Sequence, residues 1–176
     1  MTAQLRYLAF ISNDPDTLSD FYIRHFGLEK LGRSEHGDVS LSDGFYNLTF
    51  LKSRPNLGEP RMEIGLHHLG LQVDDVSEAT KQFLQLFPGN VVVSEDGGIH
   101  HGMRRFYDPE SNPVTISSDS YGVGDQPRQR PRLAHIALNA LVPERLLSFY
   151  SGIFGLRELT TSFERRKTGK LNRFAG

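Results

Sequence analysis

An internal repeat constrains the fold of this chain more than any other feature of its sequence. The same aromatic and Gly-Leu motif occurs twice, 128 residues apart: Phe21-Tyr22 with Phe26-Gly27-Leu28, and Phe149-Tyr150 with Phe154-Gly155-Leu156. A third, more diverged copy lies between them and opens at Leu66, where the others open at Leu5 and Leu133. Motifs held in register over this distance are hard to attribute to chance. The chain is therefore built from units of about sixty residues that share one fold.

Composition narrows the class of protein. The 176 residues contain 38% hydrophobic residues and carry a net charge of −1, which is typical of a folded domain and gives no reason to expect a nucleic-acid or acidic-membrane partner. The absence of cysteine excludes disulfides, thiolate metal ligands and a cysteine nucleophile. No signal peptide and no membrane-spanning apolar stretch are visible in the sequence. We therefore expect a cytoplasmic protein.

Each unit is predicted to begin with a strand and to continue into a helix. Asp14 and the following proline start the first helix, and Gly27 ends it. Asp75 starts the second helix, and Pro143 opens the third. The short strands that should follow the first two helices lie at 28–33, 39–42, 46–52, 91–94, 103–107 and 113–117. The predicted class is α+β, with repeated β-α-β-β-β units.

The repeat also divides the chain. We expect a first unit at 1–60, a second at 61–117, a linker at 118–132 and an incomplete third unit at 133–176. The linker contains glycine, proline and three arginines, and with a net charge near zero a solvated connection is favoured over a phosphate-binding stretch. The repeat offset places the last strand of the third unit beyond Gly176. We therefore expect that this sequence is part of a longer chain, and that the last strand of the third unit and a fourth unit belong to the portion not included here.

The turn before the last strand of the second unit carries a family resemblance. It reads Asp108-Pro109-Glu110-Ser111-Asn112-Pro113. With the repeated units and their helix ends, it resembles the vicinal oxygen chelate superfamily, which includes glyoxalase I, bleomycin-resistance proteins, fosfomycin-resistance enzymes and extradiol dioxygenases. The resemblance covers nearly the whole chain and is greatest to the N-terminal part of a four-unit extradiol dioxygenase. It implies paired units that form a cupped mixed sheet with helices outside, around a divalent metal.

Strand alternation predicts which side chains face that cup. In the second unit it turns Leu69 and Leu71 toward the helix, together with His67, and leaves His68 and Gly70 on the open face. The candidate residues that the same alternation places on the open face of the three units are Tyr7, His68, His135 and Asn139.

The resemblance implies metal ligands at the first strand and the last strand of a unit, here His68 and His135. The last-strand positions are occupied by Thr49 and Thr115, and threonine is a poor ligand for Fe²⁺, Mn²⁺ or Zn²⁺. His68 would be the single ligand of the first pair, so a pocket residue is the favoured interpretation. For His135 both interpretations stay open. We expect the chain as it stands to bind a divalent metal weakly or not at all.

Three functions remain open at this stage. The first is metal-dependent chemistry of the dioxygenase or lyase type on a catechol-like or 2-oxo small molecule, in the full-length protein. The second is a metal-free binding protein of the bleomycin-resistance type, and the third is a structural, dimerising module. The predicted substrate contacts are Tyr7, Arg105, Tyr107 and Asn139, unless these side chains merely fill the cup.

The helix of the third unit raises a separate question, because it is as apolar as the others and lacks a complete unit around it. It can pack against the first pair, exchange with a second chain or remain disordered. We expect exchange, and hence a homodimer whose contact surface includes Phe149, Tyr150 and Phe154.

Overall fold

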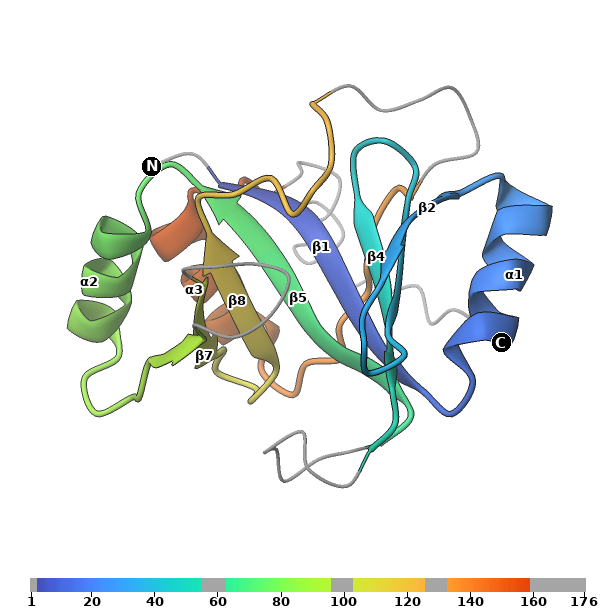
Figure 1. The fold of residues 1–176 in the computed structure, drawn as a ribbon. Helices are drawn as coiled ribbons and strands as arrows, with labels where there is room; N and C mark the ends of the chain where they lie inside the picture. Colours follow the sequence, from blue (N-terminus) through green and yellow to red (C-terminus); the bar gives the residue numbers. More distant parts are fainter. Residues whose placement is uncertain (1–2, 55–62, 96–102, 126–132, 159–176) are drawn as a thin grey trace, which may run out of the picture.

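A computed structural model describes residues 3–54, 63–95, 103–125 and 133–158. In these residues eight strands form one mixed sheet in the order β2-β3-β4-β1-β5-β8-β7-β6 (Figure 1). The elements are β1 (Ala3–Ser12), α1 (Pro15–Phe26), β2 (Glu29–Arg33), β3 (Val39–Ser42), β4 (Asn47–Lys52), β5 (Gly65–Val73), α2 (Val76–Leu86), β6 (Val93–Glu95), β7 (Met103–Tyr107), β8 (Pro113–Ser117) and α3 (Pro143–Phe154). The order β-α-β-β-β occurs twice, and the predicted α+β class is confirmed.

The two halves of the sheet meet at its centre. β1 pairs with β5 in antiparallel orientation, and each of these strands has the last strand of its own unit parallel to it on the other side. α1 lies beside the half that contains β2 and β4, whereas α2 and α3 lie beside the half that contains β7 and β8 (Figure 1). The arrangement is the expected pairing of two units with helices outside. No helix in the described residues is long and apolar enough to cross a membrane.

The main core lies between the helices and one face of the sheet. Leu69, Leu71 and Val73 of β5 are buried in it, as alternation predicts, together with Phe83 of α2 and Phe106 of β7. The opposite face carries a second, smaller buried cluster made by Tyr7, Ala9, Met103 and Tyr121. We call this opposite face the cavity face.

All three predicted helix starts are confirmed, and the first two carry a side-chain cap. The Asp14 carboxylate accepts a hydrogen bond from the Thr17 backbone N–H at 3.1 Å, and the Asp75 carboxylate accepts one from the Glu78 N–H at 2.9 Å. α1 ends at Gly27, whose φ of 64° is the left-handed conformation that favours glycine. These local signals explain why the helix boundaries could be predicted closely.

The predicted first strand of the third unit is not formed. Residues 133–142, which we call the strap, contain neither helix nor strand. The strap is held at both ends by turns of the sheet. Its Leu133 N–H donates to the Asp43 carboxylate at 2.7 Å, and its Val142 N–H donates to the Glu110 carboxylate at 2.9 Å. Because β1 and β5 already have a neighbour on each side, the apolar pattern of the strap finds no free central strand to pair with and packs against the core instead.

α3 packs within its own chain, the first of the three routes open to it. Phe149 is 0% exposed and lies 6.1 Å, ring to ring, from both Phe83 and Phe106. The Tyr150 hydroxyl donates to the Asp108 carboxylate at 3.0 Å. Burial and the negative charge of Asp108 raise the pKa of Tyr150, so this phenol remains a hydrogen-bond donor.

The homodimer remains a prediction, but its expected contact surface conflicts with this packing. Phe149 and Phe154 are buried against α2 and β7, so a second chain could contact them only by replacing the chain's own second unit.

The expected solvated linker is also packed in its described part. Residues 118–125, which we call the plug segment, follow β8 and include Tyr121 at 0% and Val123 at 8% exposure. The interpretation as a solvated connection is therefore wrong for Tyr121 and Val123, whereas Ser118, Asp119, Gly122, Gly124 and Asp125 are exposed. The three arginines of the expected linker and residues 126–132 lie outside the described residues.

Candidate functional site

The cavity face brings several of the predicted site residues into one row. The strand register pairs Arg105 with Thr115, Thr115 with Gly70, Gly70 with Tyr7, and Tyr7 with Asn47. This row runs across β7, β8, β5, β1 and β4. Two of the predicted substrate contacts, Tyr7 and Arg105, therefore share a row that crosses the boundary between the two units.

Tyr121 of the plug segment covers the middle of this row. Its ring stacks on Tyr7 with 5.0 Å between centroids and 17° between planes. A Cβ atom at Gly70 would lie 2.7 Å from the Tyr7 Cβ and 3.0 Å from the Tyr121 ring, so only glycine allows this approach. The plug segment thus fills the cup with the chain's own aromatic side chain, and Tyr7 serves as packing.

Sequence reasoning missed Tyr121, although one signal was present. A glycine inside a strand often marks a place where another group approaches the backbone closely, and Gly70 is such a glycine.

The positions where a metal carboxylate was expected form hydrogen bonds of a different kind. The Thr49 hydroxyl donates to the Asn47 side-chain oxygen at 2.8 Å and lies 2.7 Å from the Ser40 hydroxyl. Asn47 in turn donates from its amide nitrogen to the Tyr121 carbonyl at 2.8 Å. Thr115 donates to the Leu69 carbonyl at 3.3 Å. The last-strand positions therefore anchor the plug segment and the sheet, and their donor set does not fit a divalent metal.

Arg6 anchors the other end of the plug segment. The register of β1 shifts between Leu5 and Tyr7, so Arg6 is the extra residue of a β-bulge. Its guanidinium is 0% exposed, donates to the Gly124 carbonyl at 2.6 Å, pairs with Asp125 at 3.2 Å and lies 4.2 Å from the Phe45 ring centre. Arg6 is thus a buried cation that holds the plug segment through Gly124 and Asp125 and also contacts Phe45 between β3 and β4, and sequence alternation did not predict this role.

A second bulge brings the two adjacent histidines of β5 together. The register shifts between Ala9 and Phe10 of β1, so His67 is the extra residue opposite them. The Nδ1 atoms of His67 and His68 lie 2.7 Å apart, so one ring donates and the other accepts. The prediction that His67 points away from His68, toward the helix side, is therefore wrong, because strict alternation ends at the bulge. His68 also contacts the Tyr7 ring, 5.2 Å between centroids.

We expect acid to destabilise the protein through this pair. Burial lowers the pKa of His67 below its ordinary value of 6.5, so the unfolded chain binds more protons than the folded one between the folded pKa and 6.5. Stability should therefore fall as the pH drops below about 6.5. Urea unfolding at pH values between about 5 and 8 would measure this, with His67→Gln expected to flatten the profile. The matched control is His36→Gln, at a histidine that is 60% exposed. If the free energy of unfolding of His67→Gln fell with pH as steeply as that of the wild type, the attribution of the pH dependence to His67 would be contradicted.

Arg105 and Tyr107 form the more accessible part of the cavity face. Arg105 is half-buried and Tyr107 is 38% exposed. Burial lowers the pKa of the Arg105 guanidinium, and the nearby phenols of Tyr107 and Tyr7 oppose that shift. The phenols of Tyr107 and Tyr7 thus act on the Arg105 guanidinium, and the role of these side chains as substrate contacts stays a prediction.

The structure does not bring His135 and Asn139 to this site. Both are exposed residues of the strap, which packs on the helix-covered side of the sheet, whereas His68 contacts Tyr7 on the cavity face. Within the described residues no group of three or more His, Cys, Asp or Glu side chains is placed to hold a metal ion.

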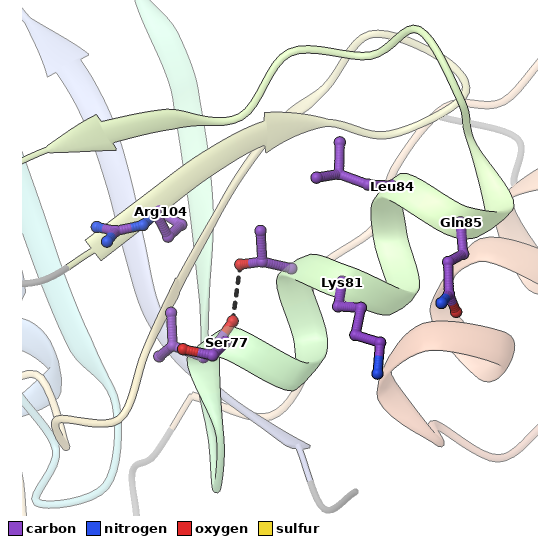
Figure 2. Close-up of a pocket in the computed structure, with 7 residues that line it drawn as sticks. Ser77, Lys81, Leu84, Gln85 and Arg104 are labelled. Carbon is purple, nitrogen blue, oxygen red and sulfur yellow. Dashed lines mark hydrogen bonds between the residues drawn. The ribbon is translucent and has the colours of Figure 1, made fainter.

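Two open pockets lie away from the centre of the cavity face. One, of about 470 Å³, borders the outer end of the plug segment and includes Glu29, Ser42 and Asp125 in its lining. The other, of about 490 Å³, lies on the flank of α2 between Ser77, Lys81 and Arg104 (Figure 2). None of the predicted site residues lines either pocket.

Comparison with known proteins reveals similarity in fold. No family model matches the chain, and no curated protein matches it. The 2,3-dioxygenase LapB from Pseudomonas sp. KL28 has a TM-score of 0.67 at 16% identity, over 88% of this chain and 60% of that one. A Mn(II)-bound glyoxalase from Novosphingobium aromaticivorans has a TM-score of 0.65 at 18% identity, over 88% and 53%. BphC, a halotolerant catechol dioxygenase, has a TM-score of 0.62 at 16% identity, over 89% and 56%. The chain thus spans between 53% and 60% of these proteins.

Proposed function

We propose that this chain, which has the fold of the vicinal oxygen chelate superfamily, takes part in metal-dependent chemistry on a small molecule with two neighbouring oxygen atoms. The reaction would be of the dioxygenase or glyoxalase type, on a catechol-like or 2-oxo compound. The observation that carries the proposal is the extent of the fold match, which includes 88% of the chain and so continues beyond the first two units. Because the chain spans 60% of the dioxygenase and 53% of the glyoxalase, the activity is proposed for the whole protein.

The two paired units would serve as the scaffold of that protein. Their ligand positions do not fit a metal, since Thr49 and Thr115 form hydrogen bonds within the sheet and Tyr7 is stacked under Tyr121. We therefore propose no metal-dependent chemical step for the first two units. Arg105 and Tyr107 retain accessible surface on the cavity face, and we propose them as substrate contacts.

His135 is the residue of the described part that we propose as a ligand for Fe²⁺, Mn²⁺ or Zn²⁺. It is exposed on the strap, whereas His68 is 5% exposed and bonded to His67. A single imidazole is not a complete site, because such metals take three or more protein donors. The other donors would come from outside the described residues. A cytoplasmic location and a small-molecule substrate are part of this proposal.

Metal and ligand titrations test the proposal. The wild-type chain should lose most of its Mn²⁺ on dialysis, because one imidazole binds weakly. With Mn²⁺ in excess, catechol should raise the melting temperature, and phenol, which lacks the second oxygen, should not. The weak Mn²⁺ binding and the rise in melting temperature with catechol should both disappear in His135→Ala. Both should persist in His68→Ala. Stoichiometric Mn²⁺ retained through dialysis and lost in His68→Ala would place the metal on the paired units and refute this assignment.

A further inference from the structure

We propose that Phe21, His25 and Phe26 of α1 form a docking surface for a second copy of this chain, with the two α1 helices packed against each other around a two-fold axis. We call these three residues the α1 aromatic surface. The proposal is independent of the proposed function and concerns a different part of the chain from the third unit.

The internal repeat shows that this surface is the exposed copy of a buried one. The repeat offset relates Phe21 to Phe149 and Phe26 to Phe154. In α3 the two phenylalanines are 0% and 1% exposed, whereas in α1 they are 47% and 42% exposed. Phe21 and Phe26 are the only exposed phenylalanines among the described residues. The same motif is therefore covered in one unit and uncovered in another.

The packing of α3 shows what kind of surface covers the motif. Phe149 lies 5.6 Å from the Phe87 ring and 6.1 Å from the Phe83 ring, and Phe154 stacks on Phe106 at 6.0 Å. All three neighbours belong to the second unit. The motif thus packs against aromatic side chains on the helix and strand of another unit with the same fold.

α1 cannot cover its own aromatic surface, because it attaches to the sheet through a different face. Tyr22 points to the core and lies 5.4 Å from the Phe50 ring. Phe21 remains outside, with its ring 4.9 Å from His25 and 5.8 Å from Phe26. The three rings form one continuous exposed aromatic surface, which a partner protein could cover.

Charge indicates that the partner is a second α1. Asp20 and Arg24 flank Phe21, lie 3.2 Å apart and have side chains that are 60% and 74% exposed. In an antiparallel pair of α1 helices, Asp20 of each copy can face Arg24 of the other. A surface that is self-complementary in this way suits a two-fold contact, in which the same patch serves both copies.

The test is the concentration dependence of mass for the full 176-residue chain, measured by sedimentation equilibrium. The wild type should dimerise, and Phe21→Ser with Phe26→Ser should weaken the dimer by about 10-fold or more, since aromatic anchors dominate such contacts. Both residues are exposed, so circular dichroism should report an unchanged fold.

A charge reversal provides the matched control. Asp20→Arg alone should weaken the dimer, because it places like charges together. Asp20→Arg combined with Arg24→Asp should restore it, because the reversed pair is again self-complementary and also keeps the contact within each helix. A monomeric wild type would overturn the proposal. A dimer that none of these variants changes would overturn it as well and would move the contact elsewhere, for example to the third unit.

Discussion

Replacing Tyr121 by alanine is expected to lower the free energy of unfolding by about 3–5 kcal/mol, the range for removing a buried aromatic ring. Tyr121 is fully buried and stacks on Tyr7, and its removal leaves a cavity above Gly70. Urea unfolding would measure the change. The control is Tyr107→Ala, at a tyrosine of the same face that is 38% exposed, where a loss of about 1 kcal/mol or less is expected. Equal losses in the two variants would contradict the role of Tyr121 as a plug.

A double-mutant cycle sharpens this test. Gly70→Ala should be costly in the wild type, because its Cβ would lie 3.0 Å from the Tyr121 ring. In the Tyr121→Ala background the steric clash between the new Cβ and the Tyr121 ring is absent, whereas the clash with the Tyr7 Cβ remains. The second substitution should therefore cost less there than in the wild type. Strict additivity would show that the ring does not rest on Gly70.

Replacing Phe149 by alanine is the second change with a large expected effect, again about 3–5 kcal/mol. Phe149 is 0% exposed and joins α3 to Phe83, Phe87 and Phe106. The repeat supplies the matched control, because Phe21→Ala removes the same side chain from the same motif position where it is 47% exposed. That control should lose about 1 kcal/mol or less in dilute protein. Hydrogen exchange should also show faster exchange in α3 for the Phe149 variant alone. Similar losses for both variants would refute the packing of α3 within the chain.

The secondary structure of the first two units could be predicted from sequence because its signals are local. Asp14, Gly27 and Asp75 mark helix ends through contacts within a few residues, and the repeat supplies each signal more than once. The third unit shows the limit of this reasoning. Its first segment has the alternating pattern of a strand, but strand formation depends on a free neighbour in the sheet, which no local pattern records.

The candidate site was harder to predict, for two physical reasons. Alternation assigns faces correctly only while the strand stays regular, and the bulges at Arg6 and His67 each add one residue. The plug segment was assigned to a linker by its glycines, yet Tyr121 is held there by Asn47, 74 residues away in sequence. The predicted grouping of Tyr7 with Arg105 agrees with the strand register, whereas His135 and Asn139 depended on a strand that is not formed.

The long-range anchors of the plug segment also bear on how the chain folds during synthesis. The guanidinium of Arg6 contacts the Gly124 carbonyl across 118 residues of sequence. At synthesis rates of about 5–20 residues per second, the ribosome needs roughly 6–24 s to make that partner after Arg6 has been added. Until then β1 carries an uncompensated cation at a position that is buried in the native protein, so its docking in the centre of the sheet is unfavourable. We therefore expect β1 to be fixed in the sheet only after the plug segment has been made, with its backbone edge open to other chains until then.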